Sequence, residues 1–264
     1  MKVFLTGASS GIGEAMARIY AARGATLGVV ARRGDFLEQL KGSLSTTVET
    51  YACDVRDAAA MRAAGAAFTA KHGTPDLVIG NAGVSYGNIT TSEKDVEIFR
   101  EILDINVLGL VNTFHPFAAD MRKRGSGTLA GIASVAGFRG LPGATAYSAS
   151  KAGAISYLEG LRVEMRARGV RVVTVCPGFI ATPMTAKNPY PMPFIIEAGD
   201  AARRIVRVMD SKNSFAVIPW QMAIVGRLLK LVPNALFDRM MQGRGHKPRK
   251  SDEPPGADRP PPGA

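Results

Sequence analysis

The sequence is poor in cysteine and histidine: its 264 residues include two cysteines and three histidines. Cys53 and Cys176 each lie inside an apolar run that reads as a strand, so two buried, reduced thiols are favoured over a disulfide. A reducing compartment is therefore expected. His72, His115 and His246 are scattered, with no partner at metal-ligand spacing, so the sequence predicts no metal site.

Long hydrophobic runs and a leader segment are also missing. The first apolar run begins at Val3, which leaves no room for the charged start, apolar centre and cleavage site of a secretion signal. No uninterrupted apolar stretch approaches the roughly 18 residues that suggest a membrane-spanning helix. These absences predict a cytoplasmic protein.

Acidic residues are outnumbered by basic ones. The 33 lysines and arginines exceed the 22 acidic residues, which gives a formal charge of +11. Such an excess is compatible with nucleic acid, an anionic membrane surface or a polyanionic cofactor. The chain has no zinc-finger spacing and no basic stripe interleaved with aromatic residues, so nucleic acid is not an expected partner.

Seven short apolar runs alternate with helical patterns. The runs cover residues 3–5, 27–30, 48–53, 77–79, 128–133, 170–176 and 215–218. Because they are continuously apolar, each is expected to be a strand buried on both faces of a parallel sheet. Helical patterns cover 13–23, 36–40, 58–71, 96–121, 146–168 and 198–209, and Pro116 is expected to kink or end the fourth. The sequence thus predicts a doubly wound, Rossmann-like α/β fold.

The chain divides by composition into three parts. Residues 1–219 form the predicted dinucleotide-binding and catalytic domain, 220–241 a helical extension, and 242–264 a disordered tail rich in basic residues and proline. The extension sets apolar side chains such as Trp220 and Leu228 against Arg227 and Lys230. One hypothesis is that it touches an anionic membrane surface or guards a lipophilic pocket, and the alternative is that it packs on its own domain or a partner subunit.

A glycine-rich loop follows the first predicted strand and opens the first predicted helix. Unpaired backbone N–H groups and the helix dipole at such a position bind phosphate, and glycine lets a pyrophosphate approach closely. A purely structural tight turn is the alternative. The expected cofactor contacts in the loop are Gly7, Ser9, Ser10, Gly11, Ile12 and Gly13.

The end of the second predicted strand indicates which cofactor binds. A carboxylate there would favour a ribose 2′-hydroxyl, but the chain has Arg32 and Arg33, so NADP(H) is favoured over NAD(H). The alternative is that both arginines are a solvated helix entry. Asp54 and Val55 follow the third predicted strand and are expected beside the adenine, although Asp54 could instead cap the next helix.

Tyr147 and Lys151 are four residues apart in a helical pattern and share one helix face. A nearby ammonium and a bound nicotinamide cation would stabilise the phenolate and make the tyrosine a proton-transfer group. Ser134, just after the fifth predicted strand, could bond the substrate oxygen, and Asn106 could hold a water at a local helix distortion. Each residue singly has a structural alternative, such as a surface pair or a turn residue.

Together these residues resemble the short-chain dehydrogenase/reductase family. The resemblance covers residues 1 to about 219 and rests on the glycine loop, Asn106, Ser134, the Tyr147 and Lys151 pair, and two further stretches, Asn81-Ala82-Gly83 and Pro177-Gly178 followed by Thr182. It implies that serine orients the substrate oxygen, tyrosine moves the proton, lysine binds the nicotinamide ribose and lowers the tyrosine pKa, and asparagine holds a relay water.

The resemblance also implies further cofactor contacts. Asn81, Ala82 and Gly83 would line the cofactor at the centre of the sheet, and Pro177, Gly178, Ile180 and Thr182 would lie at its nicotinamide end. An arginine after the second strand marks the NADP(H)-preferring members, although Ser10 stands where some of them carry a basic residue. The long helices at 96–121 and 146–168 imply a homodimer or homotetramer.

The expected activity is hydride transfer between NADP(H) and a carbonyl or alcohol. The segment from Met184 to Phe194, which closes over the substrate in this family, is largely apolar and suggests a lipophilic substrate. Several methionines after Thr182 could line an adaptable pocket, and core packing is the alternative for each. Other readings of the whole chain are a non-catalytic NADP(H) sensor, or an epimerase or dehydratase that uses the same tyrosine.

Overall fold

The computed structural model describes residues 1–243 and 247–250 and is built on a parallel sheet of seven strands. The strand order is β3-β2-β1-β4-β5-β6-β9, so the chain reverses its direction of travel across the sheet between β1 and β4. Each predicted apolar run forms one of these strands, which confirms the doubly wound fold. The strands are β1 (Lys2–Thr6), β2 (Thr26–Ala31), β3 (Val48–Ala52), β4 (Leu77–Gly80), β5 (Thr128–Ile132), β6 (Arg171–Pro177) and β9 (Phe215–Ile218).

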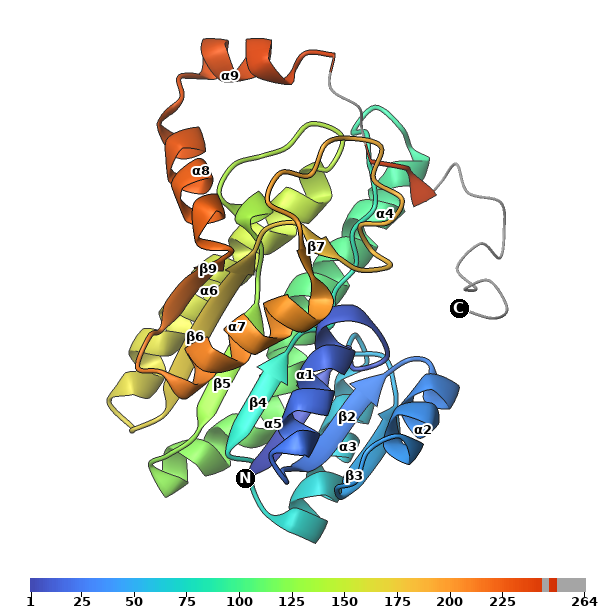
Figure 1. The fold of residues 1–264 in the computed structure, drawn as a ribbon, viewed down its shortest axis with the longest axis vertical. Helices are drawn as coiled ribbons and strands as arrows, with labels where there is room; N and C mark the ends of the chain where they lie inside the picture. The colour runs from blue at the N-terminus through green and yellow to red at the C-terminus, as the bar shows by residue number, and fades with distance from the viewer. Residues whose placement is uncertain (244–246, 251–264) are drawn as a thin grey trace.

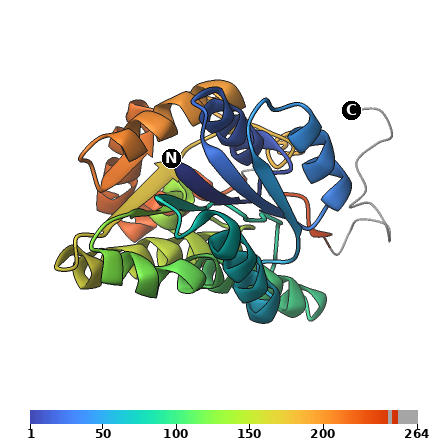
Figure 2. The ribbon, with the colours of Figure 1, turned by 90° about the horizontal axis from the view of Figure 1, so that it is seen from below.

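Helices cover both faces of the sheet, as Figure 2 shows from below. One layer contains α1 (Gly11–Ala22), α2 (Gly34–Gly42) and α7 (Ala198–Asp210), and the other contains α3 (Ala58–His72), α5 (Gly109–Arg124) and α6 (Thr145–Arg166). A separate pair of two-residue strands, β7 (Ile180–Ala181) and β8 (Ile196–Glu197), frames the segment between β6 and α7.

Each helical layer has its own hydrophobic core against the sheet. On the α3, α5 and α6 side, Phe4 of β1 is fully buried, and its ring lies 5.7 Å from that of Phe68 and 4.7 Å from that of Phe117, centroid to centroid. On the opposite side, Met16 and Tyr20 of α1 are fully buried. The continuous apolarity of the strands is explained by this two-sided burial.

The long helix expected at 96–121 is divided at Asn106, where a local distortion was suggested, and not at Pro116. It consists of α4 (Lys94–Leu103), a π-helical turn (Asp104–Leu108) and α5. Pro116 lies inside α5, which continues to Arg124, so proline does not end the helix. In the described residues, Lys94–Arg124 is the one helical run long and apolar enough to cross a membrane, but Phe114, Phe117 and Met121 are buried against the sheet.

Two helices follow the last strand, α8 (Trp220–Leu231) and α9 (Asn234–Met241), and stand apart from the two layers at one end of the molecule (Figure 1). Trp220, Leu228 and Leu231 on α8 are exposed to solvent. Whether this exposed face touches an anionic membrane stays a prediction.

Part of the expected disordered tail has a defined position. Pro248 accepts a hydrogen bond from Gly87 N, and Arg249 pairs with the buried Asp95 on α4. Residues 247–250 therefore lie against the body of the protein, and the disorder expected for the tail stays a prediction. Residues 244–246 and 251–264, also in that prediction, lie outside the described part of the chain.

We expect Phe4→Ala to lower the free energy of unfolding by about 3 to 5 kcal/mol, because it removes a fully buried ring from a packed aromatic cluster. Urea denaturation followed by circular dichroism measures the change. Phe194→Ala is the matched control, since its side chain is half exposed and its loss should cost under about 1 kcal/mol. Equal losses in both variants would contradict this account of the core.

Candidate active site

The glycine loop lies between the carboxyl ends of β1 and β4, at the point where the strand order reverses. Gly7 has a φ of +71°, and a Cβ on Gly13 would lie 2.0 Å from Gly7 O, so both positions require glycine. Asn81 Nδ2 donates to the carbonyl oxygens of Thr6 and Gly7, each at 3.1 Å. Asn81, which directly follows β4, therefore holds the glycine loop in its tight turn.

The N-terminus of α1 offers an anion site. Ser10 is the N-cap residue, and its side chain makes no capping hydrogen bond, which leaves the first N–H groups of the helix available to an anion. The side chain of Ile12 packs on the hydrophobic core, so only its backbone faces the loop. A Cβ on Gly11 would lie 3.1 Å from Thr182, which brings the segment after β7 against the loop.

The two arginines after β2 lie in different surroundings. Arg33 reaches over the glycine loop: its guanidinium donates to Ser9 Oγ at 3.1 Å and lies 4.1 Å from the ring centroid of Phe36. Arg32 is exposed. Arg33 thus places a held, planar cation beside the glycine loop.

The residues expected at the adenine have structural partners as well. Asp54 accepts hydrogen bonds from the backbone and guanidinium of Arg56; burial raises the pKa of Asp54, but these bonds outweigh it and lower the pKa overall. The next helix is capped by Asp57, which accepts from the N–H groups of Ala59 and Ala60, so Asp54 is not the cap. Val55 is buried against Gly109.

Tyr147, Ser134 and Lys151 come together at the carboxyl edge of the sheet. Tyr147 lies in the first turn of α6 and Ser134 directly follows β5. Burial raises the pKa of Tyr147, and a hydrogen bond with Ser134 partly opposes this. Ser134 Oγ accepts from Ala136 N at 3.1 Å and lies 3.4 Å from Pro177 O.

The ammonium of Lys151 lies one helical turn from the tyrosine, beneath its ring. Its Nζ is 5.7 Å from the ring centroid of Tyr147 and donates to Ile132 O at 2.9 Å. Burial lowers the pKa of Lys151 to about 8. The low pKa follows from removing an ammonium from water without a carboxylate beside it, a cost that a developing phenolate would reduce.

Asn106 occupies the π-helical turn between α4 and α5. Its Oδ1 accepts from Val84 N at 2.9 Å, and its Nδ2 donates to Val84 O at 3.0 Å and to Ser150 Oγ at 2.9 Å. The side-chain amide is thus bonded to protein atoms, and the water expected beside Asn106 stays a prediction. A Cβ on Gly83 would lie 3.1 Å from Asn106 Oδ1 and 3.5 Å from Lys151 Nζ, so glycine allows this approach.

A cavity of about 860 Å³ opens over Tyr147 and Ser134. One wall comes from the segment after Thr182, including Met184 and Tyr190, and another from Met222 and further residues of α8 and α9. Of the methionines considered for a pocket, Met184, Met222, Met240 and Met241 line the cavity, whereas Met192 does not and Met209 lies in the core beside Tyr20.

The remaining predicted residues support this cavity and the cofactor site. Pro177 ends β6 beside Ser134, and Gly178 packs so closely on Met222 that a Cβ would lie 2.6 Å from its side chain. Ile180 is buried in β7, and Ala82 N donates to Thr6 Oγ1 at 3.3 Å.

Sequence reasoning missed Arg139 and Lys247 as lining residues of this cavity. Arg139 donates to the carbonyl oxygens of Leu229 and Val232 and so secures the end of α8. No local pattern marks either residue, because each reaches the site through long-range contacts. Among residues 1–243 and 247–250, no group of three or more His, Cys, Asp or Glu side chains is arranged to hold a metal ion.

Comparisons with known proteins agree with this geometry. The family model for short chain dehydrogenases matches residues 1–191. An uncharacterized oxidoreductase of Myxococcus xanthus is 40% identical over 237 residues, covering 89% of this chain and 93% of its own length. A second from Mycobacterium tuberculosis is 34% identical over 245 residues, covering 90% and 96% respectively.

The solved structures that match include a short chain dehydrogenase from Burkholderia cenocepacia in complex with NADP. It has a TM-score of 0.77 and 25% identity, and the match covers 91% of this chain and 97% of that one. The chain belongs to the short-chain dehydrogenase family, and it is an oxidoreductase of that family.

The low pKa of Lys151 predicts a specific dependence of stability on pH. The folded protein releases this proton near pH 8 and the unfolded chain near 10.5, so between these values the unfolded state binds more protons and stability rises with pH. Relative to Lys151→Met, the free energy of unfolding of the cofactor-free protein should rise by about 2 kcal/mol from pH 7 to 9.5.

Urea denaturation at several pH values measures this difference. Lys123→Met, at an exposed position, is the control and should differ from the original protein by an amount that does not change with pH. If the free energies of unfolding of the original protein and of Lys151→Met also differed by the same amount at every pH, the Lys151 ammonium would not be as desolvated as its burial indicates.

Proposed function

We propose that the protein is an NADP(H)-dependent oxidoreductase that interconverts a carbonyl compound and its alcohol, with Tyr147 as general acid and base. The observation that carries the proposal is the joint placement of Ser134, Tyr147 and Lys151 beneath one cavity, next to a glycine loop with an open helix N-terminus. NADP(H), when bound, supplies or accepts the hydride.

The side chains of the site transfer the proton, position the substrate oxygen and stabilise the phenolate. In the reducing direction, Tyr147 donates its phenolic proton to the substrate oxygen as negative charge develops there. Ser134 Oγ, which also lines the cavity, donates to the same oxygen and fixes its position. The ammonium of Lys151 stabilises the phenolate that remains, and in the oxidising direction each transfer runs in reverse.

The preference for NADP(H) rests on Arg33. Its guanidinium is held by Ser9 and Phe36, so little side-chain freedom would be lost when it pairs with a 2′-phosphate. Neighbouring family members solved with NADP, such as that of Burkholderia cenocepacia, support the same assignment. The substrate class is lipophilic, because most of the cavity wall is apolar and four methionines contribute to it.

The activity is tested by NADPH oxidation across a panel of aliphatic, aromatic and steroid-like ketones and aldehydes. Tyr147→Phe should lower kcat at least about 100-fold, because the proton donor is lost while the ring shape is kept. Tyr157→Phe, on the same helix but outside the cavity, is the matched control and should retain activity. Full activity of the Tyr147→Phe protein would exclude this mechanism, and NADPH binding without reduction of any compound in the panel would indicate a sensor.

The cofactor assignment is tested separately by replacing each arginine. Arg33→Ser should weaken NADPH binding by about 10-fold or more and leave NADH binding nearly unchanged, because a charge-assisted contact to the 2′-phosphate is lost. Arg32→Ser should have a smaller effect, since Arg32 is exposed. Fluorescence titration with both nucleotides measures the affinities, and equal weakening for NADH and NADPH would contradict the role of Arg33.

A further inference from the structure

We propose that Lys247 is a specificity-determining residue that binds an anionic group of the substrate, so that the preferred substrates are oxo acids or hydroxy acids with an apolar remainder. The inference rests on the function proposed above and adds a substrate class to it. The chain supplies this ammonium from the region after α9, far from the catalytic residues in sequence.

The segment that carries Lys247 is anchored at several points. Gly87 N donates to Pro248 O at 2.9 Å, and a Cβ on Gly87 would lie 2.0 Å from Lys247 O, so the two backbones are in close contact. Arg249 Nε lies 3.0 Å from Asp95 Oδ2, and that carboxylate is 2% exposed. The backbone position of Lys247 is therefore fixed by the contact with Gly87 and by the ion pair of Arg249 with Asp95.

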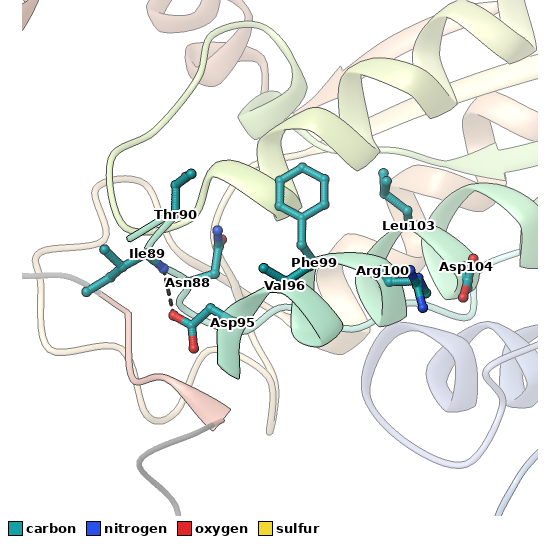
Figure 3. Close-up of a pocket in the computed structure, with 9 residues that line it drawn as sticks. All are labelled: Asn88, Ile89, Thr90, Asp95, Val96, Phe99, Arg100, Leu103 and Asp104. Carbon is teal, nitrogen blue, oxygen red and sulfur yellow. Dashed lines mark hydrogen bonds between the residues drawn. The ribbon is translucent and has the colours of Figure 1, made fainter. Parts of the chain in front are cut away.

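Asp95 is also held by a backbone N–H group of the segment that precedes α4. Its Oδ2 accepts from Ile89 N at 2.7 Å, the bond drawn as a dashed line in Figure 3, where Asp95 lies at the start of α4. Lys250 adds an ion pair of 2.8 Å to Glu101, further along α4. In Figure 1 the short red segment near the C-terminus lies beside α4 accordingly.

The side chain of Lys247 extends into the substrate cavity. Its Nζ donates to Ser85 Oγ at 2.7 Å and lies 5.8 Å from the ring centroid of Tyr147. The reacting carbon must lie beside the Tyr147 hydroxyl, so the ammonium is placed to contact a group a few bonds away from it. This distance favours an acid group near the carbonyl over one at the far end of a long chain.

The charge of Lys247 is not neutralised within the described part of the protein. No Asp or Glu from residues 1–243 or 247–250 lines the cavity, and the ammonium has no carboxylate within ion-pair distance there. The other cation in the wall, Arg139, is already bonded to the carbonyl oxygens of Leu229 and Val232. Burial lowers the pKa of Lys247 to about 8, the mark of a desolvated and uncompensated charge.

A carboxylate is the group that completes this arrangement. An ammonium has three donors, and Ser85 accepts from one of them, which leaves donors for the two oxygens of a substrate acid. Charge-assisted hydrogen bonds of this kind are among the strongest in proteins, and they gain strength in an apolar cavity. An ester or amide of the same shape would leave the charge unpaired.

The first test compares 4-oxodecanoate with its methyl ester in NADPH-dependent reduction. The original protein should favour the acid by about 10-fold or more in kcat/KM, and Lys247→Met should lower kcat/KM for the acid by about 10- to 100-fold and for the ester by less than about 3-fold. Lys247→Arg should keep most of the preference. Lys123→Met is the control, because it removes an exposed lysine that lies outside the cavity and outside this segment.

Equal loss for acid and ester in Lys247→Met, or a loss of preference as large in Lys123→Met, would overturn the proposed contact. A second measurement does not need turnover: calorimetric titration of the cofactor-free protein with octanoate and with octanamide. We expect tighter binding of octanoate by about 10-fold or more, lost in Lys247→Met. If no carbonyl compound were reduced but this difference held, the proposed function would fail and the anion site would stand; if octanoate bound no better than octanamide, the site itself would be refuted.

Discussion

The contact between Asn81 and the glycine loop is the constraint on which the site depends. One amide group donates to the last carbonyl of β1 and to Gly7, and so ties the end of β4 to the turn that precedes α1. Because the chain leaves β1 and β4 toward opposite faces of the sheet, a crevice opens between their carboxyl ends. Gly13 packs against Gly7 O without a side chain, which directs the N-terminus of α1 at this crevice. Moving either strand would displace the phosphate site and the catalytic edge together.

Electrostatics impose the second constraint. Two ammonium groups, Lys151 and Lys247, lie within 6 Å of the Tyr147 ring centroid, at 5.7 and 5.8 Å, and burial lowers the pKa of each to about 8. A third buried group, the phenol of Tyr147, is held neutral by the same desolvation. Under the two proposals, this positive charge would meet negative charge that arrives with ligands, as a developing oxyanion at Tyr147 and an acid group at Lys247.

The sequence predicted what depends on local pattern. The seven strands follow from short apolar runs, and the catalytic edge follows from Ser134 and Tyr147 lying just beyond one strand and at the start of a helix. For the long helix, the sequence suggested a kink or end at Pro116 and a local distortion at Asn106. Helix α5 continues past Pro116, and the π-helical form of the turn at Asn106 could not be predicted. The turn is stabilised by bonds from Asn106 to Val84 and Ser150, which are distant in sequence. Lys247 could not be found for the same reason, because only the pairing of Arg249 with Asp95 brings it back to the site.

The proposed catalytic residues and most residues of the cavity walls come from different parts of the chain. The floor consists of residues fixed by the sheet and by α6, whereas the walls come from the loop between β5 and α6, the segment after Thr182, α8 and α9, and Lys247. On α8, Met222 and Leu229 face the cavity while Trp220 and Leu228 are exposed, so one helix forms the substrate wall and the outer surface of the molecule. Changes in these C-terminal elements can therefore alter which substrate binds without disturbing Ser134, Tyr147 or Lys151. The proposed catalytic residues therefore belong to the sheet and α6, whereas much of the cavity wall belongs to elements that follow β6.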